Sequence, residues 1–380
     1  MHEKYYLPPI DLLDKPGESD SLVSFREVLV TLPKEKIEDR LTVVLGKSEI
    51  GNSVFFDLDK CSPLLISGTT GSGKSVCINT IICSLLMRNK PDSLKLLLID
   101  TKRLELPFYN GIPYLLTPVI TDPRRASIAL QKVVREMETR TDLLSGKFKN
   151  IEAYNEYCKE NNMPLLSYWV VVIDDMTDLV KFDKKAIEYS LTWLAKYAKS
   201  VGIFLVLSAQ RPSSEFFNGE LKENILSRIS FATSSVIDSK NILNMPGAEK
   251  LRGKGDMLFL PLGENTPKRI QGAYVSENEI SKLVDFCSSN LEKNDEQFML
   301  LNEVPSTEVE APENDPIYNE ALEFILSTGK ASASLLQRKF KLGYNRAARL
   351  IDLFEERGII GPQQGSAPRE VLYKVEDKDE

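Results

Sequence analysis

The sequence predicts an α/β protein with a large domain built on a parallel β-sheet and a small helical domain after it. Apolar runs alternate with helically spaced segments from about residue 21 to 290, the pattern of a sheet with crossover helices. A glycine-rich loop, residues 68–75, stands between an apolar run and a buried-helix pattern. Residues 316–374 carry three amphipathic helix patterns and two short apolar runs. The 380 residues suffice for one large and one small domain.

Composition divides the chain into five segments. Proline pairs and a Lys-Pro-Gly turn predict an extended start, and two acidic segments without periodicity predict a linker and a tail. In order, we expect an arm and linker (1–20), the large domain (21–290), a flexible acidic linker (291–315), the small domain (316–374) and a disordered tail (375–380).

The large domain shows its clearest strands as near-continuous apolar runs, which are typical of strands buried on both faces. The expected strands cover residues 63–67, 94–100, 169–174 and 203–208. Helical spacing predicts helices within residues 76–86, 122–146 and 184–200.

Charge and composition exclude several classes of function. A net charge of −7 means that any nucleic-acid contact must come from a local basic patch. The single histidine, His2, excludes histidine triads and histidine zinc sites. Five scattered cysteines without a C-x-x-C predict free, buried thiols and a cytoplasmic location. No apolar stretch reaches transmembrane length.

Residues 68–75 read GTTGSGKS and match the phosphate-binding pattern G-x-x-x-x-G-K-[ST]. Backbone amides of such a loop cradle phosphates, so we expect ATP and Mg²⁺ as ligands. Lys74 would reach the β- and γ-phosphates, and the Ser75 hydroxyl would ligate Mg²⁺. A glycine turn that binds nothing is the alternative. The expected nucleotide-binding residues are Gly68, Thr69, Thr70, Gly71, Ser72, Gly73, Lys74, Ser75 and Val76.

Hydrolysis needs further polar groups at the carboxyl ends of neighbouring strands. Asp174 is the candidate for Mg²⁺, through water, and Asp175 for activating the attacking water. Gln210 follows the next strand and could sense the γ-phosphate or position the water. The alternatives are a loop that starts with two aspartates and a glutamine that caps a strand. Asp100 and Lys102 line the same crevice or form a surface pair.

The small domain has the helix, helix, turn, helix and wing order of a winged helix-turn-helix. Residues 330–350 hold six basic residues and no acidic one. Asn345, Arg346 and Arg349 fall at the start of the third helix, where base edges are reached in such domains. A solvated basic face, or a winged helix that binds protein, is the alternative.

These motifs together resemble the FtsK/SpoIIIE family of double-stranded DNA translocases. The resemblance covers residues 21–290 and 315–373. It implies a RecA-like motor domain that assembles as a homo-hexameric ring around duplex DNA and moves the DNA with ATP. Besides the phosphate loop, the matching stretches are 99–106, 209–213, 227–229, 237–243, 247–249 and 255–258.

The third helix closely resembles the γ subdomain of the same family. In that family the subdomain reads a short G-rich sequence that orients the motor, and Asp352 stands where the family often has Glu. The resemblance further implies chromosome partition at cell division and a site-specific recombinase as partner. Family members are often anchored at the inner membrane at the division septum, by segments expected to be absent here.

Three departures from the family carry consequences. The family usually has Glu at Asp175, and the shorter side chain predicts slower water activation. The family tends to carry arginine near Lys199, so the cation donated in trans is expected to be Lys199 or Arg228. Stretches that resemble the two ends of the family's α subdomain lie at 6–13 and 23–29, so most of that subdomain is expected to be missing.

The sequence therefore predicts an ATP hydrolase that translocates double-stranded DNA. One alternative is a related ring ATPase that moves proteins in secretion. The other is a DNA-binding regulator in which Asp175 and Lys199 leave little or no hydrolysis and ATP gates assembly.

Overall fold

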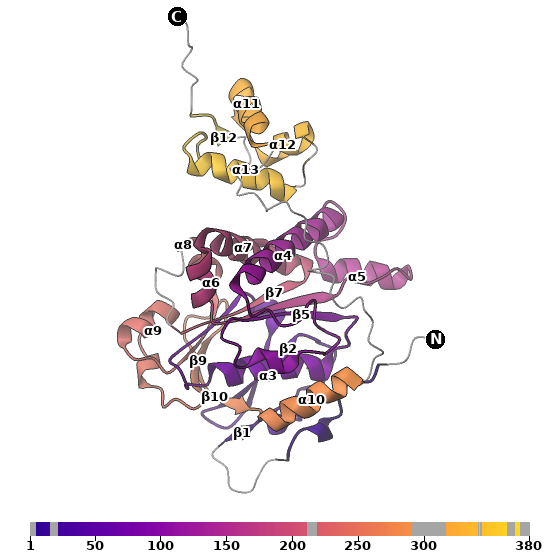
Figure 1. Ribbon diagram of the computed structural model, residues 1–380, viewed down its shortest axis with the longest axis vertical. Helices are drawn as coiled ribbons and strands as arrows, with labels where there is room; N and C mark the ends of the chain where they lie inside the picture. The colour runs from indigo at the N-terminus through magenta and orange to yellow at the C-terminus, as the bar shows by residue number, and fades with distance from the viewer. Residues whose placement is uncertain are drawn as a thin grey trace, which may run out of the picture. The chain divides into compact units, whose positions relative to one another are not determined.

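The structure is a computed structural model, and it describes residues 5–15, 22–210, 219–289, 317–340, 342, 344–362 and 369–372 (Figure 1). The chain divides into two compact units. One holds residues 1–134 and 148–303, and the other holds residues 135–147 and 304–380. The predicted linker 291–315 and tail 375–380 lie outside the described residues.

One sheet runs through the large unit. Its strands are β1 (Val23–Ser24), β2 (Thr42–Ser48), β3 (Ser53–Asp57), β4 (Leu64–Ser67), β5 (Leu94–Asp100), β6 (Tyr168–Asp174), β7 (Ile203–Ala209), β8 (Ser227–Phe231), β9 (Asp256–Leu260) and β10 (Lys268–Tyr274). The order is β3-β2-β10-β9-β8-β4-β7-β6-β5, and β1 pairs with β10. The half from β8 to β5 is parallel, as predicted.

The other half of the sheet is antiparallel and was not predicted. Strands β2 and β3, and strands β9 and β10, follow one another along the chain through short turns. Short turns permit antiparallel pairs, whereas a parallel pair needs a long crossover. The mixed α/β class is confirmed, with the parallel half carrying the phosphate loop.

The longer helices of the large unit are α3 (Lys74–Arg88), α5 (Ile151–Glu160), α7 (Lys184–Tyr197) and α10 (Glu277–Ser289). Helix α4 (Pro123–Leu144) is divided between the two units after residue 134. The shorter ones are α1 (Phe25–Leu29), α2 (Leu58–Cys61), α6 (Thr177–Phe182), α8 (Gly219–Asn224) and α9 (Val236–Leu243). The 3₁₀ turns are η1 (Ile10–Leu12), η2 (Lys34–Lys36), η3 (Leu106–Tyr109), η4 (Ala198–Val201) and η5 (Ala248–Lys250). No described helix has the length and apolar character that a membrane crossing requires.

Helices cover both faces of the parallel half. Figure 1 shows α3 and α10 on one face and α4, α6 and α7 on the other. Leu64 and Ile66 of β4 belong to the core that includes α3 and α10, whereas Leu65, also buried, alternates to the other face. Burial on both faces explains why these strands are apolar at nearly every position.

The described part of the N-terminal arm, residues 5–15, packs on the large unit instead of extending freely. Tyr5 and Leu13 are buried in its core, and the Tyr5 and Tyr114 hydroxyls lie 2.9 Å apart. The Arg26 guanidinium donates to the Leu13 carbonyl at 2.6 Å. The composition of the arm indicated a linker because Pro8 and Pro9 interrupt any helix or strand pattern that Tyr5 and Leu13 could have formed. All five cysteines are buried and free, as predicted.

The small unit contains the three predicted helices. They are α11 (Tyr318–Thr328), α12 (Ala333–Phe340) and α13 (Tyr344–Glu356), and their apolar faces meet in one core. Strands β11 (Lys330–Ala331) and β12 (Arg369–Glu370) pair antiparallel. Ile360 bridges to Val371, so the two predicted wing segments do meet, while β11 was missed. Its two residues are too few to show a strand periodicity.

Candidate functional site

The register of the parallel strands brings the predicted catalytic residues to one edge of the sheet. Asp100 pairs in register with Asp174, and the residues before Asp174 and Ser208 pair with each other. Ser67, the last residue of β4, pairs with Ala209, the last residue of β7. Gly68 and Gln210 directly follow these two residues, so they lie level with each other at the end of the sheet. The carboxyl ends of β4, β5, β6 and β7 therefore converge, as in other open α/β sheets.

The phosphate loop adopts a backbone that glycine permits. Gly68 and Gly73 have φ angles of 149° and 122°. A Cβ on Gly68 would lie 2.7 Å from the Phe231 Cβ, and one on Gly73 would lie 2.9 Å from the Gly255 Cα. Glycine is thus required at both positions for the loop to pass its neighbours.

The Lys74 side chain is buried beneath the exposed tip of the loop. Its Nζ donates to the carbonyl oxygens of Gly68 at 2.8 Å and Thr69 at 2.9 Å. Burial lowers the pKa of Lys74, and attraction to Asp174 and Asp175 opposes that shift. The ammonium therefore lies between the loop and both carboxylates.

Helix α3 begins at the loop and directs its N-terminus toward the same space. Its first turn closes with a bond from the Cys77 amide to the Gly73 carbonyl at 3.0 Å. The amides of Lys74, Ser75 and Val76 precede that bond and have no acceptor within the helix. Such a terminus attracts anions, and the half-buried Ser75 hydroxyl lies in the same turn.

Asp174 is half-buried at the end of β6. Burial and repulsion from Asp100 raise the pKa of Asp174 to about 6, and the charge of Asp175 adds to the effect. The buried Ser208 hydroxyl, level with Asp174 on β7, faces that carboxyl group and partly offsets the rise in its pKa, but it makes no hydrogen bond of normal geometry among the described residues. A cation or a water at this position would relieve the repulsion and satisfy the hydroxyl.

Asp175 is buried and has a φ of 60°, a left-handed conformation that aspartate tolerates better than most residues. Its Oδ1 accepts the Thr177 amide at 3.1 Å, and its Oδ2 forms an ion pair with the Lys102 Nζ. Burial alone would raise the pKa of Asp175, but the bonds from Lys102 and Thr177 outweigh it and lower the pKa. The carboxylate is held ionised.

Asp100 and Lys102 are not a surface pair. Asp100 is fully buried, and its two oxygens accept five backbone amides at 2.9–3.1 Å, those of Lys102, Arg103, Leu104, Glu105 and Leu106. Asp100 therefore shapes the loop after β5, and Lys102 on that loop reaches Asp175. In the sequence, the signal for Asp100 and Lys102 was their position at the end of a buried strand. That position does not show that Asp100 binds the loop backbone while Lys102 pairs with Asp175.

Three residues around the phosphate loop were not predicted. The Ala232 carbonyl accepts the Thr69 amide at 2.9 Å, and the Gly255 amide donates to the Ser72 carbonyl at 2.9 Å. Phe231 fills the space under Gly68. Phe231 ends β8, Ala232 follows it, and Gly255 precedes β9. Backbone contacts of this kind leave little trace in side-chain patterns, although 255–258 was among the matching stretches.

The residues present fit ATP and Mg²⁺. The glycine cradle, the free amides of α3 and the Lys74 ammonium suit a polyphosphate. Ser75 and Asp174 supply the oxygen ligands that Mg²⁺ prefers, and the Ser208 hydroxyl has capacity left for a water. Gln210 lies directly after β7, level with Gly68, and the residues beyond it, 211–218, lie outside the described part.

The two finger candidates lie in different surroundings. Lys199 is exposed in η4, before β7, and its Nζ lies 3.4 Å from the Lys60 carbonyl oxygen. The seven residues of β7 separate it from Gln210 by about 20 Å, so it faces away from its own loop. Arg228 is buried and donates to the carbonyls of Lys222, Ile225 and Ile242. Of these two candidates, the Lys199 side chain is therefore exposed and that of Arg228 is buried.

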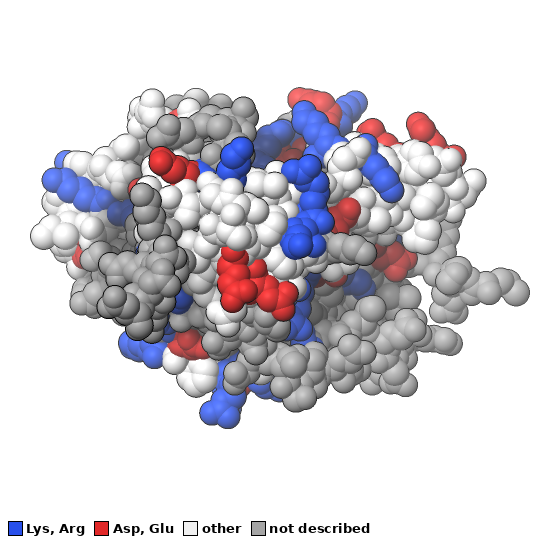
Figure 2. All heavy atoms as spheres, turned by 90° about the horizontal axis from the view of Figure 1, so that it is seen from above, with Lys and Arg blue, Asp and Glu red and all other residues white. Residues whose placement is uncertain are grey.

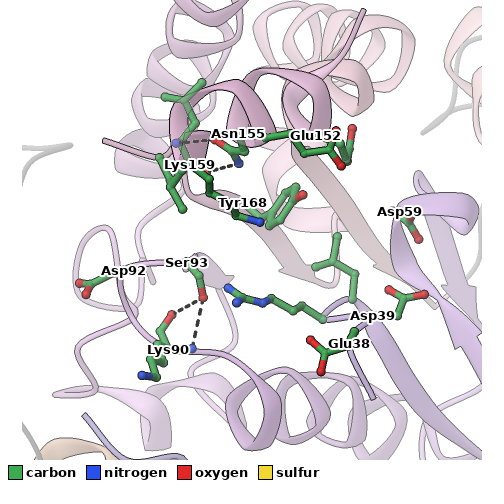
Figure 3. A pocket seen from close by; sticks show the side chains of 15 residues that line it. Glu38, Asp39, Asp59, Lys90, Asp92, Ser93, Glu152, Asn155, Lys159 and Tyr168 are labelled. Carbon is green, nitrogen blue, oxygen red and sulfur yellow. Dashed lines mark hydrogen bonds between the residues drawn. The ribbon is translucent and has the colours of Figure 1, made fainter. Parts of the chain in front are cut away.

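A cavity of about 570 Å³ lies at the amino edge of the sheet, away from the predicted site. Figure 3 shows Glu152, Asn155 and Lys159 on one side and Lys90 and Ser93 on another. The lining mixes carboxylates with cations, and none of the predicted catalytic residues lines it. A neighbouring hollow shares Asp59 and Glu152 with this cavity and contains Lys199.

The predicted DNA-contacting residues lie on α13. Arg346 and Arg349 are partly buried in its first half, and nothing is described of the Asn345 side chain. Asp352 accepts from the Arg369 guanidinium at 3.4 Å, which ties β12 to α13. On the face that Figure 2 displays, described basic and acidic side chains are interspersed. Any base reading would therefore depend on a few placed side chains.

Comparison with known proteins identifies relatives of both units. A sequence model of the FtsK/SpoIIIE family matches residues 25–214, and one of the Ftsk gamma domain matches residues 312–374. The chain is 46% identical to DNA translocase SpoIIIE of Bacillus subtilis, over 97% of this chain and 47% of that protein. It is 46% identical to DNA translocase FtsK of Listeria monocytogenes, over 96% and 49%. The chain spans about half the length of these curated relatives.

Solved structures share the fold of the large unit. The pCW3 conjugation coupling protein TcpA, determined with ATPγS, superposes with a TM-score of 0.58 at 26% identity, over 70% of this chain and 75% of that one. The type VII secretion ATPase EccC of Thermomonospora curvata gives a TM-score of 0.63 at 20% identity, over 73% and 36%. The second likeness concerns the fold alone.

Proposed function

The chain belongs to the FtsK/SpoIIIE family, and from this membership we propose that it is a motor that hydrolyses ATP to translocate double-stranded DNA. The observation that carries the proposal is the convergence of Lys74, Asp174 and Asp175 at one edge of the sheet. A phosphate cradle, a metal-holding carboxylate and a carboxylate kept ionised are the parts that phosphoryl transfer to water needs.

The chain's own residues divide the work of hydrolysis. The amides of residues 68–76 hold the phosphates, and Lys74 exchanges the carbonyl oxygens of its own loop for phosphate oxygens. Ser75, and Asp174 through a water, would hold Mg²⁺, which would supply positive charge against the phosphates. Asp175 accepts a proton from the attacking water, and Gln210 orients that water. Burial around Lys74 and Asp175 strengthens each of these electrostatic contacts.

We propose that six copies form a ring and that each site is completed in trans. Lys199 lies at the edge opposite its own phosphate loop, so it can serve a neighbour's site but not its own. A cation delivered across a subunit interface couples turnover to the arrangement of the ring. Contacts from the ring to duplex DNA would be to phosphates, which carry no sequence information.

The winged helix would give the motor its direction. Arg346 and Arg349 suit the O6 and N7 atoms of guanine, and Asn345 suits adenine, so a G-rich duplex is the expected target. Asp352, held by Arg369, would contribute at the edge of that surface. The matching family model is that of the gamma domain, which supports this assignment.

Chromosome partition at cell division is the setting that we propose for this activity, by analogy with relatives named DNA translocase FtsK. Free, buried cysteines suit a reducing cytoplasm. A site-specific recombinase acting on the moved DNA is the partner we propose by resemblance.

A triplex-displacement assay tests the translocation proposal. A labelled third strand bound to a long duplex should be released by the protein with ATP, and not with a nonhydrolysable analogue or by Lys74→Ala. Release should be faster when a G-rich site points the motor at the triplex, and Arg349→Ala should remove that bias. Duplex binding without phosphate release would favour the regulator, and absence of duplex binding would favour a motor that moves protein.

A further inference from the structure

The loop after β5 is unusually well anchored for a segment that borders a catalytic site. Its amides from Lys102 to Leu106 are all held by the buried Asp100 carboxylate. Five bonds from one charged group fix the path of the loop and hence the position of the Lys102 backbone. The loop is rigid where it presents a lysine to the site.

A second set of contacts ties the same loop to the phosphate-loop helix. The Asn79 amide of α3 lies 3.4 Å from a Glu105 carboxylate oxygen. The Asn79 oxygen accepts the Tyr109 hydroxyl at 3.0 Å, and Tyr109 is fully buried. The loop and the first turns of α3 therefore keep a fixed spacing.

Lys102 uses this position to contact Asp175. Its Nζ forms an ion pair with Oδ2, while the Thr177 amide holds Oδ1. The Asp175 side chain is 6% exposed and that of Lys102 is 32% exposed. The ion pair is thus partly shielded from water, and both carboxylate oxygens are fixed.

The other cation of the site, Lys74, acts on Asp175 by longer-range attraction and makes its hydrogen bonds elsewhere. Lys74 donates to the carbonyls of Gly68 and Thr69. Asp174 carries the same charge as Asp175 and repels it. Among the described residues, Lys102 is therefore the cation that holds the Asp175 carboxylate in place.

We propose that Lys102 is a positioning residue, which fixes the Asp175 carboxylate where it must meet the attacking water. This inference rests on the proposed function and deepens it. Because a misplacement of about 1 Å can cost about 10²-fold in rate, a catalytic carboxylate depends strongly on an anchor. Lys102 supplies that anchor from the rigid loop.

The test compares Lys102→Met, which keeps the stem and loses the charge, with Lys102→Arg, which keeps the charge. We expect Lys102→Met to lower DNA-stimulated kcat by about 10²-fold. The affinity for a fluorescent ATP analogue should change much less, because the Lys74 ammonium donates its hydrogen bonds to Gly68 and Thr69 and the charge of Lys102 acts on Lys74 only at longer range. Lys102→Arg should recover much of kcat. Lys181→Met, which removes the exposed ion pair of Lys181 and Asp178, is the matched control and should behave as wild type.

A double-mutant cycle separates positioning from a general structural role. If Lys102 acts through Asp175, then Lys102→Met in an Asp175→Asn background should cause no further loss of kcat. Thermal unfolding without nucleotide should show coupling between the two positions as well. Equal kcat for Lys102→Met and wild type, or additive losses with Asp175→Asn, would overturn the inference. A wild-type protein without DNA-stimulated hydrolysis would instead overturn the proposed function.

Discussion

The two edges of the parallel sheet treat their polar groups differently. At the carboxyl edge, Lys74 bonds to carbonyls of its own loop, Asp174 is crowded by like charges, and the Ser208 hydroxyl has no partner among the described residues. At the amino edge, Arg88 donates to the carbonyls of residues 36, 37, 39 and 42. Asp57 accepts from Lys36, Lys60 and Thr42.

For these residues, the difference separates groups that hold the fold from groups whose bonds a ligand would complete. The distinction is one of bonding and does not apply to every residue of an edge, because the buried Asn89 Oδ1 atom at the amino edge also has no partner among the described residues. A buried polar group with all its bonds made contributes to stability, and its loss leaves its partners unsatisfied. A buried group with bonds still to make is costly in the empty protein and is favoured when the ligand arrives. Asp100 shows that the rule concerns bonding and not location, because it is saturated although it lies at the carboxyl edge.

The largest expected effect on ATP turnover comes from substituting Lys74, at the carboxyl edge. Lys74→Ala should lower ATP turnover by about 10³-fold or more, because it removes the ammonium that is held at the carbonyls of the phosphate loop and would pair with the transferred phosphate. Phosphate release with duplex DNA measures it. The free energy of unfolding should change little, and turnover above a tenth of wild type would break the comparison.

A second prediction contrasts two aspartates of the same edge. Asp100→Ala should cost about 4 kcal/mol of stability, because five backbone amides lose a charged acceptor. Asp175→Asn should cost much less, since the amide oxygen can still accept from Thr177, yet it should lower turnover by about 10²–10⁴-fold, to a rate that can still be measured. Urea unfolding and phosphate release measure the two effects. Similar stability losses for both variants would contradict the distinction.

The amino edge supplies a third prediction. Arg88→Met keeps the stem but loses the bonds to the carbonyls of Lys36, Asp39 and Thr42, and should cost about 2 kcal/mol. The folded variant should retain its nucleotide affinity, which a fluorescent ATP analogue would report. A loss of affinity without a loss of stability would mean that this edge takes part in binding.

The smallest effect concerns pH. Burial opposes ionisation of Asp57, but its bonds to Lys36, Lys60 and Thr42 prevail and lower its pKa to about 2. The folded pKa is below the unfolded value of about 3.9, so the stabilisation is present above pH 4 and is lost as the pH falls toward 2. It amounts to less than about 2 kcal/mol. In Asp57→Asn, the free energy of unfolding should fall less steeply between pH 4 and pH 2 than in the wild type. The same fall in both proteins would contradict the lowered pKa of Asp57.

The sequence predicted the parallel half of the sheet and the phosphate loop well. Continuous apolar runs that end in Asp100 and Asp174 predicted two strands and the edge of the sheet at which both aspartates lie, and the loop motif predicted the position of Lys74. The three helices of the small unit were predicted because the apolar faces of α11 and α13 have a clear helical period.

What the sequence could not supply were contacts made by backbone groups and by residues distant along the chain. The five bonds to Asp100 require the loop to turn back on itself, which no side-chain pattern encodes. The packing of Tyr5 against Tyr114 joins residues more than 100 positions apart. The antiparallel strands β9 and β10 were hidden because polar residues interrupt their apolar runs.

The central claim is that the site at the carboxyl edge of the parallel strands hydrolyses ATP in response to duplex DNA. The most direct measurement is phosphate release by the wild-type protein at saturating ATP, with and without long duplex DNA. We predict a severalfold higher rate with DNA, lost in Lys74→Ala and in Asp175→Asn. Equal rates with and without DNA, or a rate that survives Lys74→Ala, would contradict it.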